Sequence, residues 1–405
     1  MSDQFTVVTK QGFGSRFGNS IKGMIFGFVF FVGSFPLLWI NEGRAVSVAK
    51  SLAEGAKSVV SVVAESLDVD NEGKLVHLNG LVEADTDPVD PISGVTVQAL
   101  GLKREVEMYQ WIENEKRESV QKTGGGTEQR ITYSYRTDWD DERIDSDSFH
   151  RTEGHENPGD WPLRSESFRS DNATVGAFTL GAGARQELSG WSSLNVGLAI
   201  EFPDSFGEFQ RVSDTEYYLG ENPKDPQVGD MRVRFNFQPE ATYSVVARQS
   251  GDVLDTYETS NGRTILLVER GEKTAAEMFK AAQDRNSTLT WILRGVGAFV
   301  MWIGLITIFA PLSRLFDILP FLGNLASKGI ALISAVMSVF LSLMTIGFAW
   351  IFYRPLLGGT LVVLAVALVW WMRRGKKPAM ASTNMGPPSA PSGPPMAPPP
   401  PPPAA

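Results

Sequence analysis

The sequence predicts a multi-pass membrane protein with four transmembrane α-helices and a large β-rich (α+β) extracytoplasmic domain inserted between helices 1 and 2. Four apolar runs, one near the N-terminus and three near the C-terminus, are long enough to cross about 30 Å of hydrocarbon as helices. Charge separates in the same way. Of 46 acidic residues only Asp3 and Asp317 lie outside residues 41–288, whereas eleven of the 37 Lys and Arg do, so this segment has a net charge of −18 and the remainder +9. Within the segment, apolar residues alternate with polar ones at the period-two spacing of half-buried strands.

The first apolar run, residues 21–40, follows a short cytoplasmic N-terminus, residues 1–20. The run continues into a polar stretch without a small-x-small cleavage site, which is typical of an uncleaved signal anchor. Gly23 and Gly27 form a GxxxG pair that lets another helix approach closely, although such pairs also arise by chance. We take these two glycines as a candidate face for helix packing or oligomerisation.

The cationic flanks of the apolar runs follow the positive-inside rule, which predicts that both termini are cytoplasmic. An even number of spans then places the acidic domain, residues 41–288, across the membrane in the periplasm or a lumen. Its acidic surface repels phosphate backbones, so nucleic-acid binding is not expected. The chain has no cysteine, so the domain depends on its core rather than on disulfides, and this favours a bacterial source.

Strand signals occupy most of the domain. The predicted strands are Lys74–Asn79, Val106–Ile112, Arg130–Thr137, the pair Met231–Phe237 with Tyr243–Arg248, and the hairpin Val253–Thr259 with Thr264–Glu269. Asn261-Gly262 accepts the positive φ of a tight hairpin turn, and the glycines at 124–126 separate two strands rather than cradling a phosphate. Helical segments connect the domain to the membrane: Arg44–Ala64 on one side, and on the other a helix that starts at the capping box Thr274–Glu277.

The C-terminal third contains the remaining membrane segments. They are transmembrane helix 2 at 289–310, an interfacial amphipathic helix or plain loop at 311–328, transmembrane helix 3 at 329–353, transmembrane helix 4 at 355–372, and a disordered, basic and proline-rich cytoplasmic tail at 373–405. Helices 3 and 4 are joined so closely that they must form an antiparallel hairpin. The tail has polyproline II character and either docks an aromatic groove or simply solubilises the chain.

Helix 3 carries a serine every fourth residue, at Ser334, Ser338 and Ser342, so the three hydroxyls share one face. This face is a candidate surface for helix packing or oligomerisation, with a polar permeation stripe as the alternative. The candidate interfacial anchors are Arg354, Trp370, Trp371, Arg373 and Arg374.

No motif for nucleophilic, phosphate-binding or zinc chemistry occurs, so we expect neither an enzyme nor a cofactor. The only candidates for metal binding, His150 with His155 and the acidic cluster after Trp139, lie in loop-forming sequence and are better explained as solvated strand ends and turns. Four aromatic residues of two predicted strands are candidates for core packing or for contact with partners: Tyr109, Trp111, Tyr133 and Tyr135.

Nine short sequence motifs, in order from the first apolar run to the last, resemble those of the LUMA family, also called the transmembrane protein forty-three family. They are NEGRA (41–45), SLAEG (51–55), NEGKLVH (71–77), VEMYQW (106–111), TYSY (132–135), GHENP (154–158), PQVGDMRV (226–233), ARQSGD (247–252) and FYRPL (352–356). The resemblance covers roughly residues 20–372, and the acidic surface and absent cysteines suggest a bacterial member.

The resemblance implies a four-span protein with a large lumenal domain, which in animals resides in the endoplasmic reticulum and inner nuclear membrane beside emerin and lamins. It implies no catalytic residues. We therefore expect a non-enzymatic membrane scaffold that self-associates and organises membrane proteins or lipid domains through protein binding. The alternatives are an ion channel or pore lined by helices 3 and 4, and a lipid-binding accessory to a lipid-metabolism enzyme. Expected partners are membrane lipids, further copies of the chain and other membrane proteins, in a bacterial inner membrane with a periplasmic domain, or in the endoplasmic reticulum or inner nuclear membrane of a eukaryote.

Overall fold

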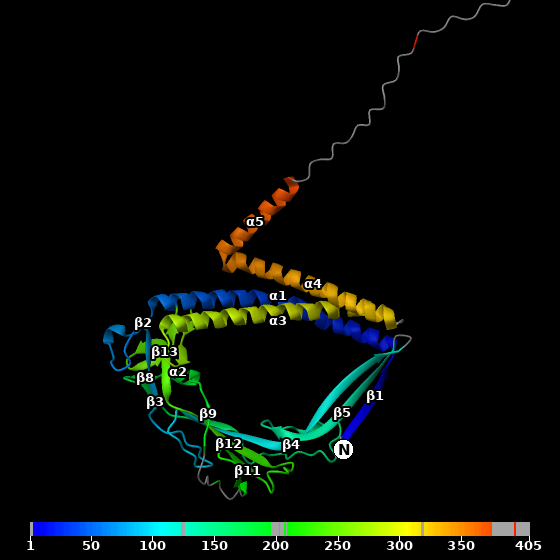
Figure 1. Cartoon of the computed structure of the whole chain (residues 1–405). Coiled ribbons are helices and arrows are strands. Elements are labelled where there is room, and N and C mark those ends of the chain that lie inside the picture. The colour runs from blue at the N-terminus through cyan, green and yellow to red at the C-terminus, as the bar shows by residue number, and fades with distance from the viewer. Residues whose placement is uncertain are drawn as a thin grey trace, which may run out of the picture.

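The computed structural model describes residues 3–122, 126–195, 202, 206–207, 209–316, 320–374 and 393. The chain forms a ring, with a bar of long helices on one side and β-structure on the other (Figure 1). The helices are α1 (Phe13–Ser58), the short α2 (Ala182–Glu187), α3 (Ala275–Leu315), α4 (Pro320–Tyr353) and α5 (Pro355–Arg374). Helices α1, α3 and α4 make up the bar, and α5 projects away from the ring.

Helix α1 contains both the predicted apolar run at 21–40 and much of the helix predicted at Arg44–Ala64. Its 46 residues span about 70 Å at 1.5 Å per residue, about twice the thickness of bilayer hydrocarbon, so one end must continue into the β-rich domain. Helix α3 starts at the predicted capping box. The Glu277 backbone N–H donates to Thr274 Oγ1 over 3.3 Å, and the Thr274 N–H donates to the Glu277 carboxylate over 2.8 Å.

Three helices of the described chain are long and apolar enough to cross a membrane, within Gly14–Ser58, Ala275–Leu315 and Leu325–Tyr353. The helix or loop predicted at 311–328 is not a separate element, because α3 continues through Pro311 to Leu315 and α4 begins at Pro320. Residues 317–319 lie outside the described chain. Residues 355–372 do form a helix, but their role as a fourth span stays a prediction.

Helices α1 and α3 lie side by side along the bar because small residues let their backbones approach. A Cβ atom on Gly27 would lie 2.8 Å from Thr307 Cβ and 2.9 Å from the Gly304 carbonyl oxygen. Leu38 fills the space beside Gly297 in the same way and is fully buried. The α1–α3 pair therefore accepts no larger side chain at these positions without moving apart.

The β-rich domain contains two main sheets. The eight-stranded sheet has the order β1-β5-β4-β12-β11-β10, with β6 also paired to β4 and β9 to β12. Its strands are β1 (Asp3–Gln11), β4 (Gly101–Gln121), β5 (Thr127–Asp140), β6 (Glu166–Arg169), β9 (Ser192–Ser193), β10 (Phe209–Arg211), β11 (Glu216–Leu219) and β12 (Met231–Gln238). Its core gathers the buried residues Leu102, Val106, Met108, Met231, Val233 and Phe235.

The seven-stranded sheet has the order β17-β13-β14-β8-β7-β3-β2, with β13 also paired to β3. Its strands are β2 (Val60–Ser61), β3 (Leu75–Ala84), β7 (Ala173–Val175), β8 (Phe178–Leu180), β13 (Ala241–Ser250), β14 (Val253–Asp255) and β17 (Leu267–Arg270), and a small hairpin adds β15 (Tyr257–Glu258) and β16 (Thr264–Ile265). One face of this sheet packs on α1 and α3 through the cluster Leu52, Leu75, Val246, Ile265, Met278, Phe279 and Ala282. This cluster joins the domain to the bar.

Strands occur where the sequence predicts them, but two of the predicted pairings are wrong. The segments at 231–237 and 243–248 do not pair with each other, because β12 lies beside β4 in one sheet and β13 lies beside β3 in the other. The hairpin around Asn261-Gly262 pairs only over β15 and β16, since β14 and β17 turn away to bond β13. Gly262 has φ +76°, as the predicted turn requires.

The N-terminal strand β1 closes the ring. It pairs with β5 over nine positions, from Asp3 opposite Tyr135 to Gln11 opposite Thr127, and α1 starts two residues later. This corrects the predicted separation of residues 1–20 from the domain. If residues 21–40 crossed a bilayer at right angles, β1 would lie on one side of it and the rest of the β-rich domain on the other. The β4–β5 hairpin, which pairs with β1, would then have to pass through the hydrocarbon. Open, polar sheet edges do not occur there.

Candidate functional site

The strongest polar cluster lies where the helices of the bar leave the apolar region. The Glu42 carboxylate, on α1 and fully buried, accepts hydrogen bonds from Arg294 of α3, Nε to Oε1 over 2.6 Å and Nη2 to Oε2 over 2.9 Å. Trp350 of α4 donates its indole N–H to Oε2 over 2.8 Å. One carboxylate thus joins three helices, and its desolvation is offset by a two-point ion pair.

Arg44 of α1 and the neutral polar residues that it contacts extend this cluster toward the domain. Arg44 donates to the side-chain oxygens of Asn286 and Thr290, each over 3.0 Å, and to that of Asn41 over 3.3 Å. The Asn41 amide in turn donates to the Thr290 carbonyl over 3.1 Å. These bonds fix the crossing of α1 and α3 just beyond the apolar stretch.

A cavity of about 480 Å³ opens beside this cluster, between α1, α3 and the end of α4. Arg294 and Arg354 both line it, with Trp291 and Trp350 beside them. The Arg354 guanidinium carbon lies 5.8 Å from the Trp350 ring centroid, and that of Arg294 lies 4.6 Å from the Trp291 ring centroid. Charge and aromatic surface thus meet at one level of the helix bar.

The four aromatic candidates lie on the paired strands β4 and β5, which form the arch of the ring with β1. Tyr133 stacks on His150 with ring centroids 4.3 Å apart, and Tyr135 stacks on His155 at 3.9 Å. Trp111 meets His155 edge-on. The remaining candidate, Tyr109, packs on Trp139 and accepts a hydrogen bond from Thr137 over 2.8 Å. The contacts of Trp111, Tyr133 and Tyr135 with the two histidines attach the loop after β5 to the arch. Only Tyr135 is fully buried, and the others are half-buried.

Burial, together with the 2.7 Å hydrogen bond that the Tyr135 hydroxyl donates to the Glu113 carboxylate, raises the pKa of this hydroxyl to about 12. The Arg151 backbone N–H donates to the same hydroxyl over 3.0 Å. The histidines, considered above as candidates for metal binding, serve as ring partners here. Within the residues that the structure describes, no group of three or more His, Cys, Asp or Glu lies close enough to hold a metal ion.

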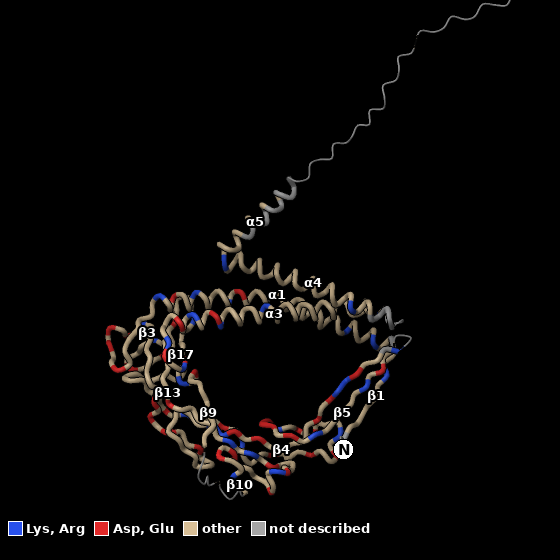
Figure 2. The backbone as a smooth tube through the Cα atoms, in the orientation of Figure 1, with Lys and Arg blue, Asp and Glu red and all other residues tan. Residues whose placement is uncertain are grey.

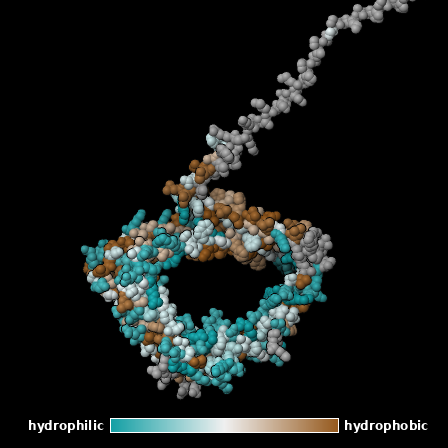
Figure 3. Space-filling model, viewed as in Figure 1, coloured by the Kyte–Doolittle hydropathy of each residue, from teal (hydrophilic) through white to brown (hydrophobic). Residues whose placement is uncertain are grey.

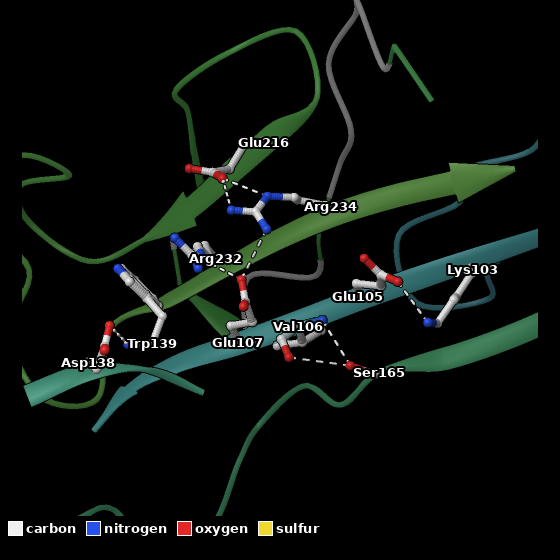
Figure 4. A network of polar contacts seen from close by, with 10 residues as sticks. All are labelled: Lys103, Glu105, Val106, Glu107, Asp138, Trp139, Ser165, Glu216, Arg232 and Arg234. Atoms are coloured by element: carbon white, nitrogen blue, oxygen red, sulfur yellow. Dashed lines mark hydrogen bonds and ion pairs between the residues drawn. The ribbon is translucent and has the colours of Figure 1, made fainter. Parts of the chain in front are cut away.

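A ladder of ion pairs crosses the eight-stranded sheet (Figure 4). Arg232 pairs with Glu107, whose carboxylate also accepts from Arg234 over 3.1 Å, and Arg234 pairs with Glu216 over 2.7 Å. The Arg232 guanidinium carbon lies 4.6 Å from the Trp139 ring centroid. These charges neutralise one another along the sheet, which is typical of surface stabilisation rather than of catalysis.

The small-residue faces predicted for packing or oligomerisation lie inside the helix bar. Gly23 and Gly27 face Thr307 of α3. On α4, Ser338 donates to the Ala298 carbonyl over 2.6 Å, Ser342 contacts the Met301 sulfur at 3.6 Å, and Ser334 is fully buried. Both faces therefore pack within a single chain, and self-association through them stays a prediction.

Of the predicted anchors, Arg354 lies against Trp350, and Trp370 on α5 is about half exposed. The side chains of Trp371, Arg373 and Arg374 lie outside the described part of the chain. Sequence reasoning missed the Glu42–Arg294 pair. The available signal was a lone glutamate two residues after one apolar run and an arginine just inside another, which are opposite charges at similar depth.

These features define a class: a membrane protein whose apolar helices support an α+β domain of two sheets. Comparison with known proteins is consistent with that class. The family model described as Transmembrane protein 43 matches residues 108–355. Transmembrane protein 43 of Mus musculus is 36% identical over 367 residues, covering 88% of this chain and 90% of that protein. The Homo sapiens protein is 36% identical over 89% of this chain and 91% of its own length.

A homolog from Drosophila melanogaster is 30% identical over 86% of this chain and 94% of its own length. The chain therefore belongs to the transmembrane protein 43 family, as its sequence motifs indicate. These relatives are animal proteins, so the expectation of a bacterial source finds no support in them. Their names refer to the membrane and to no reaction. No solved structure matches the chain.

Proposed function

We propose that this protein is a non-enzymatic membrane scaffold that self-associates and organises other membrane proteins or lipids. The observation that carries the proposal is the arch. Its distal part is a ribbon in which Asn114–Val120 of β4 and most of β1 are exposed, so it contributes little to either core. Ordering a long ribbon costs conformational entropy, and little apolar burial offsets that cost here. A role in binding a partner explains why the ribbon is retained.

The free edge of β1 supports self-association. In the described sheet β1 is an outermost strand, bonded only to β5, and it leaves one row of backbone N–H and C=O groups unpaired along nine residues. Such an edge pairs readily with another strand. Pairing with the same edge of a second copy would be antiparallel and two-fold symmetric, which is the commonest symmetry of protein dimers.

The arch also provides a charged surface for partners. Figure 2 shows that Lys, Arg, Asp and Glu are concentrated on the β-structure, whereas the helix bar is mostly uncharged. On β4 and β5 several of these charges pair along the strands, as in Lys116 with Glu118 over 2.9 Å and Arg130 with Glu128 over 2.9 Å. Mixed charge of this kind favours recognition of a specific complementary surface over general attraction to anions.

The pore alternative depends on a polar stripe that faces a channel. Two of the three serines of α4 instead contact α3, since Ser338 donates to the Ala298 carbonyl and Ser342 touches the Met301 sulfur. A channel lined by these hydroxyls would require α3 and α4 to separate. The structure thus favours the scaffold over the pore.

The first experiment tests whether β1 joins the arch in the membrane. Thr6 and Thr132 face each other across the ladder, with hydroxyl oxygens 3.2 Å apart, and the chain has no native cysteine. We expect Thr6→Cys/Thr132→Cys to form an intramolecular disulfide in isolated membranes, because directly opposed strand residues lie within disulfide range. The measurement is the mobility of the chain on a non-reducing gel. The single variants and Ser15→Cys/Thr132→Cys are controls that should not shift. No shift in the paired variant would refute the ladder.

The second experiment tests self-association directly. We expect the full chain, solubilised in detergent, to have the mass of two or more copies by light scattering, and a chain lacking residues 1–11 to have the mass of one. Removal of residues 378–405 is the matched control and should leave the mass of the complex unchanged. A monomeric full chain would contradict the proposal, and an unchanged complex after loss of β1 would contradict the role of the edge.

A further inference from the structure

The cavity between α1, α3 and the end of α4 has more positive than negative charge in and around it. Arg294 is neutralised by its two-point bond to Glu42. Arg354 also lines the cavity, and among the residues that the structure describes no carboxylate lies within ion-pair distance of its guanidinium. Arg44, next to the cavity, donates only to neutral side chains. Three guanidinium groups but one carboxylate thus lie in or next to the cavity.

The walls of the cavity are suited to a polar ligand with an apolar part. Helix α3 contributes the side chains of Gln283 and Ser287, which can exchange hydrogen bonds with a headgroup. Asn286 and Thr290 line the same space but are already bonded to Arg44 and to backbone carbonyls. Trp350 and Trp291 border the same space, and Trp291 is 66% exposed. Tryptophan is enriched at the level where hydrocarbon meets headgroups.

The position of the cavity identifies the source of the ligand. It lies where the apolar stretches of α1, α3 and α4 end, and Ile292, which follows the lining residue Trp291 along α3, is 56% exposed. In Figure 3 the bar is the hydrophobic part of the ring and the β-structure is hydrophilic. A molecule in this cavity can hold its polar end against the arginines while its apolar chains cover the exposed helix surface.

We propose that this cavity binds the phosphate headgroup of an anionic glycerophospholipid. Arg354 donates to the phosphate oxygens, because a planar guanidinium suits two-point recognition of phosphate. Gln283 and Ser287 of α3 contact the glycerol and headgroup hydroxyls. Arg294 stays bound to Glu42 and positions Trp350 without taking part in the contact. This inference needs membrane residence only and is independent of the scaffold proposal.

The test uses native mass spectrometry of the full chain in detergent, titrated with phosphatidylglycerol, phosphatidylcholine or inorganic phosphate. We expect phosphatidylglycerol to bind most tightly and Arg354→Gln to weaken it about tenfold, the typical loss of a charge-assisted contact. Arg354→Lys should restore only part of the affinity, because an ammonium keeps the charge but not the two-point geometry. Arg314→Gln, the same charge change at the other end of α3, is the matched control and should bind as the unaltered chain does.

The variants should remain folded, because within the described residues the Arg354 guanidinium forms no ion pair and lies over the Trp350 ring. Equal melting temperatures without lipid check this. Equal affinity of Arg354→Gln and the unaltered chain would overturn the proposal. An equal loss in Arg314→Gln would also overturn it, since overall charge would then explain the binding. Displacement of the lipid by inorganic phosphate at equal concentration would show a site for free anions and not for lipid.

Discussion

The two ends of α1 are held in different ways. At its C-terminal end, which we call the junction, α1 packs with α3 on the seven-stranded sheet through an apolar cluster that includes Leu52, Met278 and Phe279, all almost fully buried. At its N-terminal end α1 follows directly on β1, whose side chains are mostly exposed and whose contact with the arch is a backbone ladder. One helix thus connects a hydrophobic core to a β-ribbon.

This difference shows where the stability of the ring resides. Burial of apolar surface contributes about 25 cal/mol per Å², whereas a backbone hydrogen bond exposed to water contributes little net free energy. We therefore expect the junction to unfold with the whole protein and the arch to open locally at lower free energy. An opening arch also exposes further strand edge, which suits a surface that binds partners.

The largest effect is expected at the Glu42–Arg294 ion pair between α1 and α3. Glu42→Gln leaves Arg294 buried without a counter-charge, which should destabilise the protein by about 3–5 kcal/mol, and Glu42→Leu/Arg294→Leu should recover most of that loss. The measurement is thermal unfolding of the chain in detergent. If the double variant were as unstable as Glu42→Gln, the ion pair itself would stabilise the fold, beyond avoiding a buried unpaired charge.

A matched pair of truncations compares the two regions directly. Met278→Ala, in the junction cluster and fully buried, should cost about 2–5 kcal/mol because it leaves a cavity. Val120→Ala, in the arch and 45% exposed, should change stability by no more than about 0.5 kcal/mol. Denaturant unfolding measures both. Similar losses of stability in the two variants would show that the arch unfolds together with the core.

The smallest effect is expected from acid titration. Burial alone would raise the pKa of Glu269, but hydrogen bonds from Lys273 and Arg285 hold it below its ordinary value of 4.5. A lowered pKa contributes stability that is present above pH 4.5 and is lost as the pH falls through the folded-state pKa. Glu269→Gln should therefore be less stable than the unaltered chain at pH 7, with the difference vanishing in acid.

The arch supplies the comparison for that titration. Lys116 lowers the pKa of Glu118 through a hydrogen bond, but both side chains are exposed. Solvent screens such a pair, so Glu118→Gln should leave the pH dependence of the melting temperature unchanged. An equal effect of the two substitutions would contradict the assignment of the acid-sensitive contact to the junction.

Local signals in the sequence were sufficient for the helices and for individual turns. The capping box at Thr274 and the positive φ at Gly262 depend on residues within a few positions of one another. The apolar runs predict the bar for the same reason, since the period and length of a helix are properties of one continuous segment. Strand positions around Tyr133 and Val233 likewise follow from alternation alone.

Only the tertiary structure decided which strands pair, and how charges from distant segments meet. Met231 lies opposite Met108 in β4, Asp3 lies opposite Tyr135, and Glu42 receives Arg294 and Trp350 from helices far along the chain. An alternating pattern tells which face of a strand is buried but carries no record of its neighbour. Partner choice depends on the summed packing of the two sheets and the helix bar, which no single segment of the sequence encodes.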